Sequence, residues 1–141
     1  MCPKTPASSP LICHDAVQQP PLEALSRALE SVRERDHWSS STLNRVNLVL
    51  EEILQNIFEH GEQAGQVSVW VSSHTDSIEL LIQAPGQAFD PRAGATPDLD
   101  ESLETRMPGG VGLHLVRELC SSIDTLQLAS AHQLVLRLNR D

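Results

Sequence analysis

The chain has 141 residues, of which 40% are hydrophobic, 21% are charged and 3% are aromatic. These values predict one soluble domain with an aliphatic core, and they argue against a disordered chain or two ordinary domains. The formal net charge of −9 argues against a surface that binds nucleic acid or an anionic membrane, since both need a basic face.

Signals for export, membrane insertion and disulfide bonding are not visible in the sequence. The apolar runs all fall short of the roughly 20 residues that span a bilayer, and residues 1–10 lack the basic and apolar blocks of a signal peptide. We therefore expect a cytoplasmic protein. Cys2, Cys13 and Cys120 are widely spaced, which predicts neither a disulfide framework nor a zinc site.

The N-terminal part of the chain is predicted to hold a short strand and a helix. Residues 1–10, with three prolines, are expected to form a flexible tail, and residues 11–141 a single domain. Leu11–Val17 is interpreted as a short edge strand. The Pro-Pro pair before Leu22 suits the first turn of a helix because its φ angles are fixed. Apolar residues then follow at helical spacing until about residues 35–37.

A second helix is predicted from about Leu43 to His60. Ser39–Thr42 supplies candidates for its N-cap, and Gly61 follows its last turn. Besides the main apolar stripe, Leu48 and Val49 are apolar on another side of the helix. We therefore expect this helix to be covered on two sides and to lie at the centre of the fold.

The middle of the chain is predicted to form a β-hairpin followed by a long irregular segment. Valines alternate with other residues over 67–71, and a dense apolar run covers Ile78–Ile82, which indicates that the second strand is the more deeply buried. Residues 85–108 show no periodicity. Such a long stretch inside a compact domain is typical of a functional loop.

The C-terminal part is predicted to form a helix and a second hairpin. The helix opens at Gly109-Gly110-Val111-Gly112 and ends near Cys120. The two strands cover about Thr125–Leu128 and Gln133–Leu138, around a turn at Ser130-Ala131-His132. This order of elements favours an α+β fold, namely a two-layer α/β sandwich in which helices cover one face of a mostly antiparallel mixed sheet.

One candidate for chemistry lies on the second predicted helix. Glu52, Asn56 and His60 are spaced four residues apart, so they lie on one side of the helix axis. A carboxylate and an amide beside apolar neighbours are expected to face something other than bulk water. An exposed polar face of the helix is the alternative. These residues alone offer too few good ligands for a metal site.

Two further candidates are glycine turns. Gly86 follows the predicted buried strand in Ala84-Pro85-Gly86, where glycine permits a positive φ or the close approach of a ligand, although a plain turn is the alternative. Gly109, Gly110 and Gly112 open the third helix. Uncovered backbone N–H groups at the positive end of a helix dipole commonly hold phosphates, with a flexible hinge as the alternative.

The order of these segments is more specific than any one of them. An E-x-x-x-N helix, a strand ending in x-x-G-x-x-F-D-P, a long loop and a G-G-x-G-L helix start resemble the GHKL ATPases, which have the Bergerat nucleotide-binding fold. The stretches LVLEEILQNIFEHG, GQAFDPR and GGVGLHLVRELCSSID are most similar to the stand-alone anti-sigma-factor serine/threonine kinases of bacterial partner switching. The resemblance covers about residues 20–140.

The resemblance assigns roles to individual residues. It implies that Glu52 is the general base that takes the proton from a substrate serine, and that Asn56 binds the Mg²⁺ that bridges the phosphates of ATP. Gly86 corresponds to the glycine of the adenine-binding D-x-G box. The stretch over 92–108 corresponds to a nucleotide lid. The second glycine box, which meets the phosphates, corresponds to Gly109, Gly110, Gly112 and Leu113.

One position departs from the family pattern. The aspartate of the D-x-G box accepts a hydrogen bond from the adenine amino group, whereas this chain has Ala84, whose methyl group cannot accept one. An unpaired buried polar edge costs about 1–3 kcal/mol, or about 5- to 150-fold in affinity. The substitution therefore predicts a weaker affinity for ATP.

Two functions follow as alternatives. The first is an ATP- and Mg²⁺-dependent protein serine/threonine kinase in signal transduction, which sequesters a sigma factor and phosphorylates a STAS-type antagonist; Glu52 and Asn56 favour it. The second is a nucleotide-poor, non-catalytic binding module of the same fold, which Ala84 favours. The detached ATPase half of a histidine kinase is a more remote alternative. The resemblance also allows a homodimer.

Overall fold

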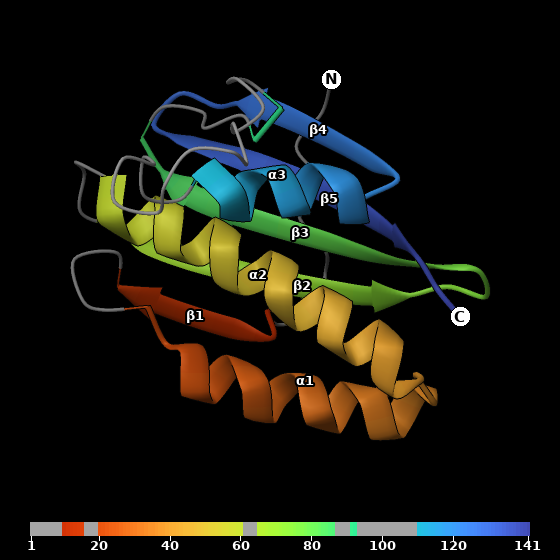
Figure 1. Cartoon of the computed structure of the whole chain (residues 1–141). Helices are drawn as coiled ribbons and strands as arrows, with labels where there is room; N and C mark the ends of the chain where they lie inside the picture. Colours follow the sequence, from red (N-terminus) through yellow and green to blue (C-terminus); the bar gives the residue numbers. More distant parts are fainter. Residues whose placement is uncertain (1–9, 16–19, 61–64, 87–90, 93–109) are drawn as a thin grey trace.

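The computed structural model describes residues 10–15, 20–60, 65–86, 91–92 and 110–141. Three helices and five strands lie in this part of the chain (Figure 1). The helices are α1 (Leu22–Asp36), α2 (Ser40–His60) and α3 (Gly110–Leu119). The strands are β1 (Ile12–Asp15), β2 (Gln66–Ser73), β3 (Ser77–Pro85), β4 (Ser122–Gln127) and β5 (Ala131–Asn139).

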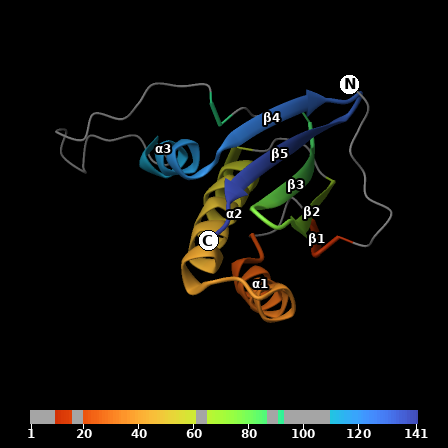
Figure 2. The ribbon, with the colours of Figure 1, turned by 90° about the vertical axis from the view of Figure 1, so that its right-hand side faces the viewer.

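The described strands form one sheet with the order β1-β2-β3-β5-β4. Each neighbouring pair is antiparallel. Figure 2 shows α2 and α3 on one face of this sheet, with α1 beside α2 near the β1 edge. The predicted two-layer α+β fold is confirmed, with the difference that the pairs described here include no parallel one.

Helix α2 forms the centre of the core. Five of its side chains are completely inaccessible to solvent: Val46, Val49, Leu50, Ile53 and Leu54. Val49, expected on a second apolar side of the helix, is also buried and joins the same core cluster as Leu50. The reason is that α2 packs against α1 and α3 and shares its core with the strands, so burial extends around much of the helix.

Helix α1 packs one apolar stripe into that core and ends at a left-handed residue. Leu25, Leu29 and Val32, at helical spacing, are buried. His37 adopts φ 59° and ψ 45°, and its backbone N–H donates to the carbonyl of Arg33. This cap stops the helix within the range predicted for its end.

The start of α2 differs from the prediction by one turn. The helix begins at Ser40 rather than at Leu43, because Ser39 caps its N-terminus. The backbone N–H of Thr42 donates to Oγ of Ser39 over 3.0 Å, which satisfies one of the N–H groups left free at a helix start.

The second hairpin also extends beyond its predicted bounds. Strand β4 begins at Ser122, three residues before Thr125, because pairing with β5 compensates for the weak strand propensity of its polar residues; Ser122 lies opposite Arg137. Strand β5 begins at Ala131, so His132 lies in a strand and not in the predicted turn.

Some expectations fall outside the described residues. They are the greater part of the N-terminal tail (1–9), the end of the predicted first strand (16–17), the start of the third helix at Gly109, and residues 93–108 of the expected lid. The described portion of the first strand, Ile12–Asp15, pairs with β2 at the edge of the sheet as expected.

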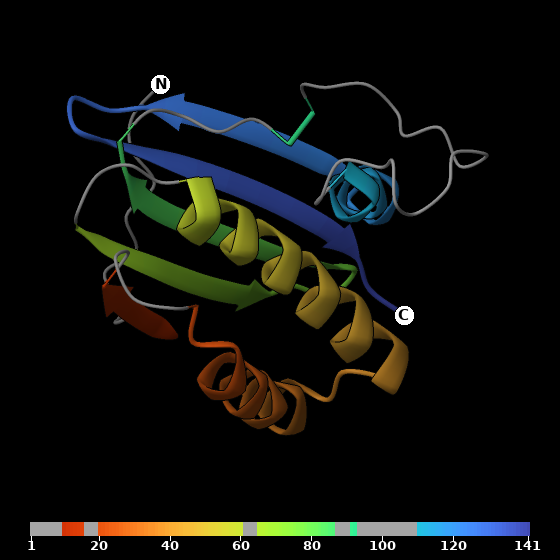
Figure 3. The ribbon, with the colours of Figure 1, turned by 60° about the vertical axis from the view of Figure 1, so that its left-hand side comes forward.

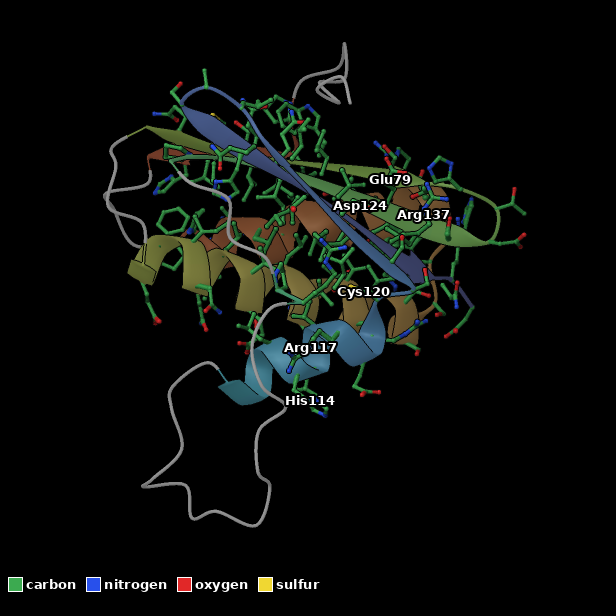
Figure 4. All side chains as sticks on the ribbon, turned by 90° about the horizontal axis from the view of Figure 1, so that it is seen from above. Glu79, His114, Arg117, Cys120, Asp124 and Arg137 are labelled. Carbon is green, nitrogen blue, oxygen red and sulfur yellow. The ribbon has the colours of Figure 1, made fainter. Side chains whose placement is uncertain are left out.

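The face of the sheet that points away from the helices carries cross-strand polar pairs. Arg137 of β5 donates to Glu79 of β3, and Figure 4 shows these two side chains together. Nε2 of Gln133 donates to Oε1 of Gln83 over 2.8 Å. Both pairs join the central strands β3 and β5, so this face helps to fix their register.

Asp36 links the end of α1 to the sheet. Its carboxylate accepts hydrogen bonds from Nε of Arg35 over 2.9 Å and from the hydroxyl of Ser73 over 2.6 Å. Trp38 donates its indole N–H to the same hydroxyl over 3.0 Å, and Arg140 donates to the Asp36 carbonyl. The Arg35 hydrogen bond is the largest cause that lowers the pKa of Asp36 to about 2.

We expect Asp36→Asn to lower the free energy of unfolding by about 1 kcal/mol at neutral pH, after allowance for solvent screening. The pKa of this carboxyl is lower in the folded chain than in the unfolded one, so its contribution is complete above about pH 4. It is then lost as the pH falls towards 2. Urea titrations at pH 7 and at pH 2 measure both values.

Glu34→Gln is the matched control, because it makes the same charge change at an exposed position of the same helix. Its unfolding free energy should stay within about 0.5 kcal/mol of the wild type. An Asp36→Asn deficit that persists unchanged at pH 2 would show that the charge of the carboxylate is not the cause.

Candidate functional site

The three segments singled out in the sequence gather at one end of the fold. They are the last turns of α2, the end of β3 and the first turn of α3. Figures 1 and 3 show the C-terminal half of α2 beside the end of β3, and in Figure 1 the first turn of α3 lies over the same half of α2. The direct packing of α2 against α3 supports this arrangement.

Glu52 is partly buried on the third turn from the end of α2. Burial is the largest cause that raises its pKa, and repulsion by the carboxylates of Glu51 and Glu59 raises it further. A carboxylate with a raised pKa binds a proton more strongly than an ordinary glutamate. Glu52 therefore has the chemistry of a general base.

Asn56 lies one turn further along the same side of α2 and is only 7% exposed. Its Nδ2 donates to the backbone carbonyl of Glu52 over 2.8 Å, which fixes the orientation of the amide. In the described part of the chain Oδ1 has no hydrogen-bond partner, so this oxygen is available to a ligand. The exposed polar face considered as an alternative does not describe Asn56.

An amide oxygen is a ligand that Mg²⁺ accepts. Among the residues described, no group of three or more His, Cys, Asp and Glu side chains could hold a metal ion. Asn56 therefore suits an ion whose other ligands come from phosphates and water, as is common for Mg²⁺. It does not suit a metal held by protein side chains alone.

Ala84 and Gly86 lie at the end of β3 and just after it. Ala84 is 1% exposed, and Gly86 adopts φ +90°, a conformation that favours glycine. The N–H of Gly86 donates to the carbonyl of Ser130 over 3.0 Å, and its carbonyl accepts from Nε2 of Gln127 over 3.1 Å. The β4–β5 hairpin thus holds this turn in place.

His132 lies beside the candidate site, and the sequence reasoning did not single it out. It faces Ala84 directly in the pairing of β3 with β5, and it is 3% exposed. Neither ring nitrogen has a hydrogen-bond partner in the described structure. The sequence signal that could have found it is its spacing of two residues from Leu134, which is itself two residues from Leu136. Alternate residues of a strand share a face, so His132 lies on the core face once the strand begins at Ala131.

Of the predicted glycine box, Gly110 and Gly112 lie in the first turn of α3, and Gly109 is outside the described residues. The first four backbone N–H groups of a helix have no acceptor within that helix. In α3 these belong to residues 110–113, and the Leu113 side chain packs against the core. The helix start therefore presents N–H donors at its positive end, which suits an anion.

Comparison with known proteins now identifies the family. The family of histidine kinase-like ATPase domains matches residues 18–139. The chain belongs to this family. The ATPase family implies that the domain binds ATP, with Mg²⁺ as the typical accompanying ion.

A curated relative gives a narrower comparison. The serine/threonine-protein kinase BtrW of Bordetella bronchiseptica is 31% identical over 98 residues, which cover 67% of this chain and 69% of BtrW. Within the histidine kinase-like ATPase family, the chain is therefore similar to a serine/threonine-protein kinase. In the described helices, none is both long and apolar enough to cross a membrane.

Proposed function

We propose that the chain is an ATP- and Mg²⁺-dependent protein serine/threonine kinase of partner switching, which sequesters a sigma factor and phosphorylates a STAS-type antagonist. The observation that supports this proposal most strongly is that Glu52 and Asn56 lie one turn apart on the same side of α2. One side chain has a raised pKa, and the other has an available amide oxygen. The family and the similarity to BtrW support the same class of enzyme.

Different residues of the chain have different roles in phosphoryl transfer. Glu52 accepts the proton as the O–H bond of the substrate serine or threonine breaks and its oxygen becomes the nucleophile. Asn56 would hold Mg²⁺ through Oδ1, and the N–H groups of residues 110–113 would bind phosphate oxygens. ATP supplies the γ-phosphoryl group to the new P–O bond and leaves as ADP. Gly86 lets the backbone approach the base closely.

A second candidate function rests on Ala84, where the family has an aspartate. A methyl group accepts no hydrogen bond from adenine, so the domain could sequester a partner without transferring phosphate. The two candidates differ in their affinity for nucleotide. A kinase must bind ATP with Mg²⁺ in its wild-type form, whereas a nucleotide-poor module would bind it only after the aspartate is restored.

Calorimetric titration of the wild type and of Ala84→Asp with ATP and Mg²⁺ separates the candidates. The kinase proposal expects micromolar affinity for ATP in the wild type. With radiolabelled ATP, the chain should then transfer the label to a STAS-domain protein encoded in the same genome. Binding by Ala84→Asp alone, or binding without any transfer to such proteins, would favour the module.

The pH dependence of transfer follows from the raised pKa of Glu52. Transfer needs the deprotonated carboxylate, so the acid limb of kcat/KM should lie above the pH expected for an ordinary glutamate. Glu51→Gln removes one repulsive charge and should move this limb to lower pH. A pH–rate profile of both proteins tests this, and an unmoved limb in Glu51→Gln would assign the acid limb to another group.

A further inference from the structure

His132 is a buried polar side chain that the proposed mechanism does not use. It is 3% exposed, and both ring nitrogens lack a hydrogen-bond partner among the described residues. Buried polar atoms in folded proteins are paired in the great majority of cases, because an unpaired one loses its bonds to water without replacement. An imidazole with two unpaired nitrogens therefore indicates a ligand that pairs with it.

The position of His132 connects it to the nucleotide site. It lies opposite Ala84 in the sheet. Both residues are buried, and each alternates with core residues of its strand, so both belong to the core face. Opposite residues in antiparallel strands have Cβ atoms about 4.5–5.5 Å apart. The side chain opposite the imidazole is therefore only a methyl group, and Gly86 follows Ala84 by two residues, just after the end of β3.

Burial is the largest influence on the pKa of His132 and lowers it, whereas a hydrogen-bonding approach of the Gly86 backbone raises it. That backbone does not meet hydrogen-bond geometry with either ring nitrogen. A lowered pKa keeps the ring neutral at pH 7. A neutral imidazole has one N–H donor and one nitrogen that accepts, and acceptance is the property that the methyl group of Ala84 lacks.

We propose that His132 accepts the hydrogen bond from the exocyclic amino group of adenine in place of the side chain at position 84. This inference rests on the proposed nucleotide site and specifies how that site recognises its base. The acceptor lies on β5 instead of β3, one strand away from the usual position. The base would then pair with a nitrogen that is unpaired in the free protein.

The test uses two nucleotides that differ only at the amino group. ATP and purine riboside triphosphate, each with Mg²⁺, are titrated into the wild type and into His132→Leu. The wild type should prefer ATP by about 5- to 150-fold, and His132→Leu should retain less than about threefold preference. His132→Gln keeps an acceptor and should retain most of the preference.

Thermal unfolding without ligand provides a second readout. His132→Leu removes two unpaired buried atoms, so its Tm should rise by about 2–8 °C. Thr42→Val is the matched control, because Thr42 is 1% exposed but its hydroxyl contacts Ser39, Arg45 and the Asp141 N–H. Its Tm should fall, and its preference for ATP should equal that of the wild type.

Each other outcome overturns the inference. These outcomes are equal affinity of the wild type for both nucleotides, no nucleotide binding, or a full preference for ATP in His132→Leu. A fall in Tm with unchanged preference would assign His132 a purely structural role. Failure of phosphoryl transfer in a protein that prefers ATP through His132 would contradict the kinase function and leave this inference standing.

Discussion

Glu52→Gln is expected to lower the rate of phosphoryl transfer by about 10²- to 10⁴-fold and to leave the affinity for ATP within about threefold of the wild type. Glutamine has nearly the same shape as glutamate but cannot take a proton from the substrate hydroxyl. The amide of Asn56 bonds to the backbone carbonyl of residue 52 and not to its side chain, so its orientation should survive the substitution.

Glu51→Gln is the matched control for this experiment, because it removes the same charge from the adjacent residue of α2. Glu51 accepts a hydrogen bond from Nδ2 of Asn47 over 3.2 Å, so its side chain is engaged elsewhere on the helix. Transfer near neutral pH should remain within about threefold of the wild type in this variant. Single-turnover transfer and ATP titration are measured for both. An equal loss of ATP binding and of transfer in Glu52→Gln would contradict the role of general base.

The helices, and the sequence of helices and strands along the chain, were predictable because their signals are local. Apolar spacing along α1 and α2 and the alternation in β2 reflect which face of each element is buried, and a single domain of this size offers few arrangements that bury them. The predicted bounds of the strands were wrong at their ends, because pairing with a neighbouring strand determines where a strand begins. Ser122 joins β4 because it lies opposite Arg137 on β5, and the sequence around Ser122 carries no strand signal of its own.

The residues of the candidate site also fall into those that the sequence could reveal and one that it could not. Glu52 and Asn56 could be singled out because their spacing and the order of the motifs are properties of the sequence. His132 could not, since its importance depends on the register that sets it opposite Ala84 and on the absence of a partner in the described fold. The strand register and the lack of a hydrogen-bond partner are both properties of the tertiary structure. A departure from a family motif is therefore best examined through the cross-strand neighbour of the altered residue.

Leu50→Ala is expected to lower the free energy of unfolding by about 2–5 kcal/mol, through lost burial and the cavity left behind. Leu50 is completely inaccessible and lies on the core side of α2, two residues before Glu52. Domains of this kind have about 5–15 kcal/mol of stability in total. The substitution therefore removes a large share of it, and the midpoint of urea unfolding should fall with little change in the slope m.

Leu115→Ala is the matched control, since it makes the same truncation on α3 at a side chain that is 38% exposed. Its loss should stay below about 1 kcal/mol, because solvent already reaches the removed atoms and no closed cavity forms. Equal losses in the two variants would show that burial of the side chain does not set the loss, contrary to a fold centred on α2. The loss of stability in Leu50→Ala also has a consequence for the candidate site. Glu52 and Asn56 are placed by the same helix that Leu50 anchors, so ATP binding should weaken in Leu50→Ala only at the temperatures where the variant begins to unfold.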